Sequence, residues 1–156
     1  MRNTTLCHIE KDGKYLMLHR VKKKNDLNQD KWVAIGGKFE DKESPEECNA
    51  RETKEETGLT INSARYCGIV TFVSDKWETE YMHIFHSTDF SGEVIPCDEG
   101  DLCWVDKKEI YNLPIWEGDK IFFRLMEENA PFFSLKLEYV GDTLVNAVLN
   151  GEKLKI

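Results

Sequence analysis

The sequence predicts an α/β fold in which several strands and two helices share one hydrophobic core. Its 156 residues fit one domain, residues 1–156, and 40% of them are hydrophobic, which is enough to build a packed interior. Short β-rich segments recur along most of the chain, whereas only two segments show helical signals. No repeat, low-complexity tract or linker interrupts the sequence, so all of these elements should belong to one core.

The strands are predicted from short or alternating apolar runs that lie between turn residues. The clearest case is a β-hairpin with arms at 4–10 and 15–21, because Asp12-Gly13 is a typical hairpin turn. Further strands are predicted at 32–35, 59–61, 66–73, 81–88, 94–95, 102–105, 132–139 and 143–149, and the last two should form a second hairpin.

The first helix has well-marked ends. Ser44 is placed to cap its N-terminus, Pro45 occupies the first helical position, and Glu47 stands three residues after the cap. The helix should end at Thr57, because Gly58 can adopt the left-handed conformation that closes many helices.

The second helix is expected over residues 116–129. Pro131 follows its end, where a proline can no longer interrupt the helical hydrogen bonds. Apolar residues recur at helical spacing within this segment: Ile121, Phe122, Leu125 and Met126.

The first helix carries a cluster of acidic residues on one side. Glu52, Glu55 and Glu56 stand at i, i+3 and i+4, and like charges at this spacing destabilise an isolated helix by roughly 0.2–0.5 kcal/mol per pair. Arg51 supplies one positive charge, whereas a divalent cation would make the whole cluster favourable. A solvated helix face has the same appearance, and the spacing favours a metal site.

A magnesium ion suits this cluster because hard cations take oxygen ligands and bind through one or two carboxylates together with substrate phosphates. Gly36-Gly37 lies just before the helix, where the absence of a side chain would let the backbone approach a metal or phosphate.

The segment 37–59 resembles the Nudix box. That motif is Gly, five residues, Glu, seven residues, Arg-Glu, an aliphatic, any residue, Glu-Glu, any residue, Gly and an aliphatic. Every specified position matches except Thr53, where an aliphatic is usual, and this departure bears on helix packing. Over nearly the whole chain the resemblance extends to the MutT-like 8-oxo-dGTP diphosphatases, especially those of Gram-positive bacteria. It is carried by LMLHR at 16–20, Asp-Lys-Trp at 30–32, WEGD at 116–119 and PFFS at 131–134.

The resemblance implies a Nudix fold, an α/β/α sandwich around a mixed β-sheet. It also implies a Mg²⁺-dependent pyrophosphohydrolase, with Mn²⁺ as a possible substitute, that converts a nucleoside triphosphate to the monophosphate and pyrophosphate. Oxidised purine nucleotides such as 8-oxo-dGTP would be the substrates. Two alternatives stay open: a hydrolase of another nucleoside diphosphate-linked compound, and a nucleotide-sensing module without turnover.

The resemblance also implies roles for acidic and basic residues. Glu52, Glu55 and Glu56 would bind the metal, and one of them or a loop carboxylate would be the general base. Arg51 and Glu43 would orient the cluster through an ion pair. Two further metal-binding positions are Gly37 and the loop residue Glu99, for which Asp98 is the alternative.

The substrate would be held by cations and aromatic rings. Arg20 and Lys38 would contact phosphates, with Lys22 and Lys23 as further candidates, although the polar stretch 22–31 also reads as a solubilising surface loop.

Recognition of the base is a separate prediction. Phe72 and Trp116 would provide a stacking surface, although such residues are as often part of the core, and Asp119 would read the purine edge. Related enzymes carry an Asp where this chain has Gly118 and an Asn where it has Val33, so the identity of the base stays open.

The overall composition argues against several partners. A net charge of -8 disfavours binding along a nucleic acid or to an RNA cap. No apolar run approaches the roughly 18 residues needed to span a membrane. The five cysteines include no CxxC pair, which indicates a reducing, cytoplasmic location. The four histidines show no metal-ligand spacing, and a small nucleotide is the expected partner of a chain for which a monomer is favoured.

Overall fold

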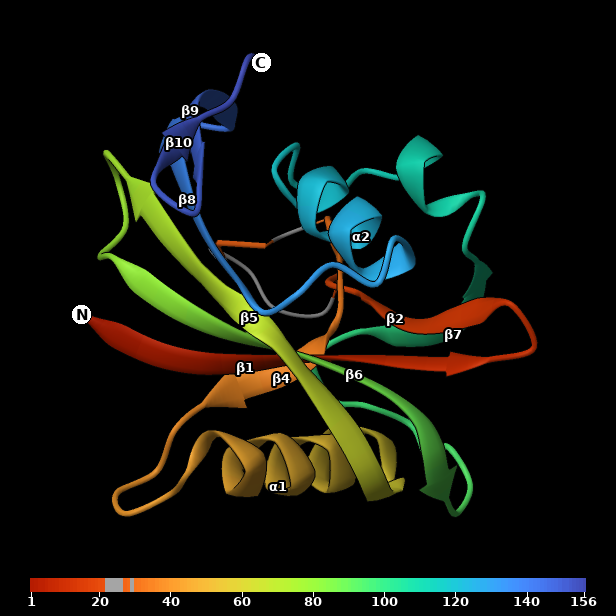
Figure 1. Cartoon of the computed structure of the whole chain (residues 1–156). Helices are drawn as coiled ribbons and strands as arrows, with labels where there is room; N and C mark the ends of the chain where they lie inside the picture. The colour runs from red at the N-terminus through yellow and green to blue at the C-terminus, as the bar shows by residue number, and fades with distance from the viewer. Residues whose placement is uncertain (22–26, 29) are drawn as a thin grey trace.

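The computed structural model describes residues 1–21, 27, 28 and 30–156, which build a mixed sheet between two helices (Figure 1). The described strands are β1 (Arg2–Lys11), β2 (Lys14–His19), β3 (Trp32–Val33), β4 (Ile35–Lys38), β5 (Thr60–Ser74), β6 (Glu80–Ser91), β7 (Asp101–Asp106), β8 (Phe133–Val140), β9 (Thr143–Leu149) and β10 (Glu152–Lys153). The helices are α1 (Pro45–Thr57) and α2 (Asp119–Glu127), with a short 3₁₀ turn at Ile110–Asn112.

The sheet follows the order β10-β9-β8-β5-β6-β1-β2-β3, with β4 added beside β1 and β7 beside β2. Strand β1 runs parallel to β6 and β5 runs parallel to β8, while the other pairs are antiparallel. Helix α1 covers one face of this sheet and α2 the other (Figure 1). The predicted α/β/α sandwich around a mixed sheet is therefore confirmed.

The first predicted hairpin forms only next to its turn, where Glu10 pairs with Tyr15 and Lys11 with Lys14, because the rest of β1 pairs with β4 and β6. Asp12 and Gly13 have φ of 53° and 75°, the left-handed pair that joins two antiparallel strands tightly. The second hairpin pairs β8 with β9, and β10 adds a short strand that the sequence did not signal.

Three strand predictions were wrong in detail. The segments 59–61 and 66–73 belong to one continuous strand, β5, because its polar middle still pairs with β6 through bulges. The segment 32–35 is divided at Ala34 into β3 and β4, which pair with different partners. The segment 94–95 is not a strand, and the Ile95 amide instead donates to the Thr57 carbonyl after α1.

Helix α1 has the predicted boundaries and caps. The Ser44 hydroxyl accepts from the Glu47 amide at 3.1 Å, the Glu47 carboxylate accepts from the Ser44 amide at 3.0 Å, and Gly58 has φ of 80°. Its buried face is thin and mostly polar. The buried residues are Cys48, Asn49, Thr53 and Thr57, whereas Ala50 is exposed.

Thr53 is fully buried, and among the described residues its hydroxyl meets no hydrogen-bonding group other than the thiol of Cys7, a weak partner. A poorly satisfied buried hydroxyl is unfavourable, so the isosteric Thr53→Val should raise the free energy of unfolding by about 1 kcal/mol. Urea unfolding of the two proteins measures this difference, and Thr60→Val, at an exposed position of β5, is the control. A loss of stability in Thr53→Val would show that the hydroxyl is satisfied in solution.

Helix α2 is shorter than predicted and begins at Asp119. The Gly118 amide donates to the Tyr139 hydroxyl at 2.8 Å, and the residues before it form a turn. A Cβ on Gly118 would lie 2.4 Å from the Leu137 side chain, so no larger residue fits at this position. The helix ends before Asn129, whose φ of 51° is left-handed.

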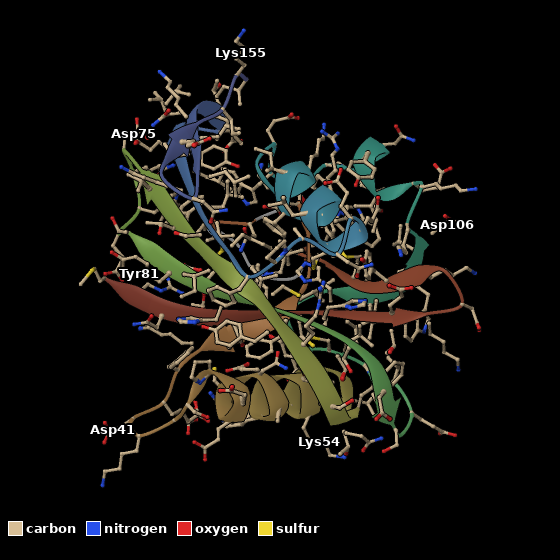
Figure 2. All side chains as sticks on the ribbon, in the orientation of Figure 1. Asp41, Lys54, Asp75, Tyr81, Asp106 and Lys155 are labelled. Carbon is tan, nitrogen blue, oxygen red and sulfur yellow. The ribbon has the colours of Figure 1, made fainter. Side chains whose placement is uncertain are left out.

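The core has one apolar layer on each side of the sheet. Side chains fill the space between α2 and the sheet, and others lie between α1 and the sheet (Figure 2). Four cysteines are buried, whereas Cys103 is exposed. The candidate residues Lys22 and Lys23 lie outside the described part of the chain. No helix among the described residues is long and apolar enough to cross a membrane.

Candidate active site

A cavity of about 430 Å³ is lined by residues of α1, of α2 and of the sheet between them. Strand β1 contributes Arg2, Thr4, Leu6 and His8, which share one face of the strand because successive residues face opposite sides, and Thr5 lines it as well. One wall is acidic and another is aromatic. The residues that line the cavity include Thr4, Leu6, His8, Arg20, Asn28, Val33, Gly36, Gly37, Lys38, Glu52, Glu56, Phe72, Glu80, Glu99, Trp116, Asp119, Phe122 and Phe123.

The carboxyl groups of Glu56 and Glu99 meet at the acidic wall. The Gly36 amide donates to Glu56 Oε2 at 3.2 Å, which fixes that side chain on the cavity side of α1. Desolvation, together with a hydrogen bond to Glu99, raises the pKa of Glu56. Two carboxylates so close to each other repel when both are ionised, so a cation would be favourable beside them.

Glu99 is held by the turn that carries it and by the guanidinium group of Arg20. The turn that carries it is closed by the bridge between Cys97 and Gly100. Arg20 Nη1 donates to Glu99 Oε2 at 3.2 Å, so Arg20 lies beside the acids as well as on the cavity wall. Asp98, the alternative in this loop, is exposed and does not line the cavity.

Arg51 lies at the centre of an ion-pair network. Its Nε and Nη2 bind the two oxygens of Glu43 at 2.6 and 2.9 Å, a bidentate pair that lowers the pKa of Glu43 to about 2 and raises the pKa of Arg51. Its Nη1 reaches Glu52 at 2.9 Å and Glu55 at 3.1 Å, and Nη2 also donates to the Lys38 carbonyl at 2.9 Å.

Glu52, Glu55 and Glu56, the three acids predicted to bind one metal, thus have different contacts in the structure. Glu52 and Glu55 are both held by Arg51, and Glu55 is 57% exposed and does not line the cavity. Glu56 instead turns toward Glu99. The acids that the structure brings to the cavity are Glu52, Glu56 and Glu99.

Glu52 lies directly against Gly37. A Cβ on Gly37 would stand 2.3 Å from Glu52 Cδ, so the glycine leaves the space that this carboxylate fills. Desolvation raises the pKa of Glu52 even though Arg51 opposes the shift.

The substitution Gly37→Ala should therefore act on activity more than on folding. The carboxyl end of Glu52 can swing away at small cost, and its displacement by about 1 Å should lower kcat/KM by about 100-fold. Gly36→Ala is the contrast, because its Cβ would stand 1.7 Å from the Thr5 carbonyl and should unfold the protein. Turnover and thermal unfolding separate these outcomes. Full activity in Gly37→Ala would show that the position of Glu52 is unimportant.

These acids fit a hard divalent cation. Within the described residues, no group of three or more Asp, Glu, His or Cys encloses a metal on its own. Mg²⁺ does not need such a cage, since it retains waters and binds substrate phosphates with one or two carboxylates. The available donors are all oxygens, and the pKa of Glu56 is raised by desolvation and by the nearby Glu99, which shows that positive charge is favourable there.

The aromatic wall is rigid. Trp116 and Phe72 pack edge to face with ring centroids 5.3 Å apart, and both are nearly buried. The indole Nε1 of Trp116 donates to Asn28 Oδ1 at 2.7 Å, and Lys31 Nζ lies 4.6 Å from the ring centroid. These two residues therefore belong to the core and also line the cavity.

Asp119 is at the start of α2 and lines the cavity beside this wall. Burial raises its pKa from 3.8 to about 8, with Lys31 opposing the shift. At neutral pH the carboxyl group is therefore mostly protonated, so it can both donate and accept a hydrogen bond.

This pKa predicts a pH-dependent stability. The folded protein retains the Asp119 proton up to about pH 8, whereas the unfolded chain releases it near pH 4, so this contribution to stability is lost as pH rises between these values. Relative to wild type, Asp119→Asn should gain at least about 1.4 kcal/mol in unfolding free energy between pH 5 and pH 8. Urea titrations at the two pH values measure this gain. Parallel pH profiles would contradict it.

Several cavity residues carried no signal in the sequence. Asn28 comes from a polar loop, and Glu80 accepts from the Thr4 hydroxyl at 2.9 Å across two strands. The alternation along β1 could have predicted that Thr4, Leu6 and His8 share a face, but not that this face borders a cavity.

The chain is similar to several known proteins in sequence and in fold. The NUDIX domain profile matches residues 1–126. An uncharacterized Nudix hydrolase of Bacillus subtilis, YvcI, is 34% identical over 124 residues, covering 76% of this chain and 75% of that protein. The oxidized purine nucleoside triphosphate hydrolase of Danio rerio is 32% identical over 130 residues, covering 82% of this chain and 81% of that protein. The crystal structure of the mutator MutT protein from Bacillus halodurans matches with a TM-score of 0.85 at 29% identity, covering 97% of this chain and 99% of that chain.

The fold and the profile match define the class of protein, a sandwich-fold hydrolase that acts on phosphoric anhydrides. Within that class, the chain belongs to the Nudix family, whose hydrolases act on small nucleotide substrates.

Proposed function

We propose that the protein hydrolyses nucleoside triphosphates to nucleoside monophosphates and pyrophosphate, with oxidised purine nucleotides such as 8-oxo-dGTP as preferred substrates. The observation that carries this proposal is that one cavity has the acids Glu52, Glu56 and Glu99 on one wall and Phe72, Trp116 and Asp119 on another. A cavity with an acidic end that would bind a cation and with an aromatic end suits a triphosphate attached to a base.

The acidic wall would hold Mg²⁺, for which Mn²⁺ can substitute, through Glu52, Glu56, Glu99 and the backbone at Gly37, with Glu55 at its margin. When bound, the metal offsets phosphate charge and lowers the pKa of a coordinated water. The carboxyl groups of Glu56 and Glu99 lie within hydrogen-bonding distance of each other, so either carboxylate, once ionised, would be placed to accept the proton of the attacking water.

The basic residues would act by position. Arg51 binds Glu43, Glu52 and Glu55 and so fixes the acids in place. Arg20 and Lys38 line the cavity and would balance the charge of the substrate phosphates. Most of the acceleration in phosphoryl transfer comes from such positioning and charge stabilisation.

The choice of an oxidised purine rests on the base end of the cavity and on the relative from Danio rerio, which bears that activity in its name. A protonated Asp119 offers one donor and one acceptor to a purine edge. We further propose that the chain acts in the cytoplasm as one domain, residues 1–156, that a monomer is sufficient, and that neither nucleic acid nor membrane is a partner.

The test is a product screen with the common and oxidised nucleoside triphosphates in the presence of Mg²⁺ and, separately, of Mn²⁺. We expect pyrophosphate rather than orthophosphate, with the highest kcat/KM on an oxidised purine. Nucleotide sugars and dinucleotide polyphosphates serve as competing substrates. Higher turnover of one of these, or nucleotide binding without turnover, would overturn the proposal in favour of another Nudix hydrolase or a sensing module.

A further inference from the structure

His8 is a buried imidazole in the wall of the cavity. It lies on β1 and is 1% exposed, yet it lines the cavity together with Asp119. No role was predicted for His8, since the histidines show no spacing that would indicate a metal site.

One nitrogen of this ring is already occupied. Nδ1 lies 3.1 Å from the Phe85 carbonyl oxygen, which can only accept, so Nδ1 carries the proton. In this tautomer Nε2 is a hydrogen-bond acceptor, and no described residue is hydrogen-bonded to it. Burial keeps the ring neutral, because it lowers the pKa of His8 to about 3.

The ring is also fixed in orientation. Its centroid lies 5.6 Å from that of Phe122 and 5.2 Å from that of Phe123, both in edge-on contacts from α2. Asp119 precedes these two phenylalanines by about one helical turn, and all of these side chains line the same cavity. Asp119 and His8 therefore border one part of it.

Two other histidines of the same sheet, His83 and His86, differ. Both nitrogens of His83 have partners, the Tyr66 hydroxyl and Asn3 Oδ1. His86 pairs with Glu10 at 2.9 Å. Nε2 of His8 is not among the described atoms that are both fully buried and unpaired, so it is accessible from the cavity, where a donor brought by a ligand would pair with it.

We infer that His8 is a specificity-determining residue whose Nε2 accepts a hydrogen bond from an N–H group of a purine base bound in the cavity. This inference rests on the proposed function, because it concerns the base of the nucleotide substrate. It adds a neutral acceptor on the sheet to the protonated Asp119 on α2. A ring nitrogen or an amino group of the base would be the donor.

The test is calorimetric binding of nucleoside monophosphates, which does not require hydrolysis. Two pairs differ in one donor group: dGMP and dIMP, and dAMP and 2′-deoxynebularine monophosphate. In a third pair, 8-oxo-dGMP has the N7–H donor that dGMP lacks, together with a carbonyl group at C8. In wild type we expect the donor-bearing member of at least one pair to bind more tightly. In His8→Leu that preference should fall by about tenfold while the other pairs are unaffected.

Two further variants separate recognition from folding. His8→Gln retains a carbonyl acceptor and should recover part of the preference. His86→Leu removes a histidine that does not line the cavity and should leave every ratio unchanged. Unchanged ratios in His8→Leu, or an equal loss for all nucleotides with no recovery in His8→Gln, would overturn the inference. The hydrolysis screen is independent: turnover with unchanged ratios removes only the role of His8, and altered ratios without turnover remove only the proposed enzyme.

Discussion

Glu56→Gln should lower kcat by about 10²- to 10⁴-fold while the protein stays folded. The glutamine amide oxygen can still accept from the Gly36 amide, so the side chain has a reason to remain in place. What is lost is the negative charge that would hold the cation and the oxygen that would take the proton. Steady-state turnover with Mg²⁺ on the best substrate of the screen measures the effect.

The stability of this variant provides a second readout. Because the pKa of Glu56 is raised, the folded protein takes up a proton that the unfolded chain releases above its ordinary pKa of 4.5, so wild type loses stability as pH rises. Glu56→Gln removes this loss, and in metal-free buffer it should be at least as stable as wild type at pH 8. Mg²⁺ should raise the melting temperature of wild type more than that of the variant.

The control is Glu46→Gln, which removes a carboxylate from the exposed first turn of the same helix. Its turnover should stay within about twofold of wild type, since surface substitutions of this kind have small effects. Wild-type turnover in Glu56→Gln would remove the acidic wall from the proposed mechanism.

Arg51→Lys should lower kcat/KM by about 10- to 100-fold and the free energy of unfolding by about 1–2 kcal/mol. Lysine keeps the charge but cannot make the bidentate contact with Glu43 while also reaching Glu52 and Glu55. The acids would then lose their fixed orientation. Kinetics at several Mg²⁺ concentrations, together with urea unfolding, measure the two effects.

Arg65→Lys is the matched control, because Arg65 is exposed on β5 and does not line the cavity. It should change neither quantity beyond the scatter of surface substitutions. If Arg51→Lys lost stability but kept full kcat/KM, the ion-pair network would serve the fold alone. If it kept both, the network would be without consequence for either.

The acidic cluster shows how far local sequence reaches. The capping residues fixed α1 at Pro45–Thr57, and the spacing of Arg51 and Glu55 implied their contact, because both depend on helical geometry alone. The same spacing also suggested that Glu56 joins Glu52 and Glu55. In the structure Glu56 and Glu52 both line the cavity and Glu55 does not, and Glu56 is held there by the Gly36 amide on β4 and by Glu99 in a distant loop.

The strands show a similar limit. The turn at Asp12-Gly13 was readable because its left-handed backbone demands particular residues. The long strand β5 was not, since its polar middle is exposed and is kept extended by pairing with β6 rather than by its own side chains.

The amino-acid order by itself therefore determined the helix that carries the acids, the hairpins, and the residue types that make a phosphate-directed site chemically reasonable. Only the tertiary structure decided which acids share the cavity, that Asp119 is buried enough to retain a proton, and that His8 lines the wall beside it. The physical reason is that hydrogen bonds within a turn or helix depend on nearby residues, whereas burial and convergence depend on elements that meet across the sheet.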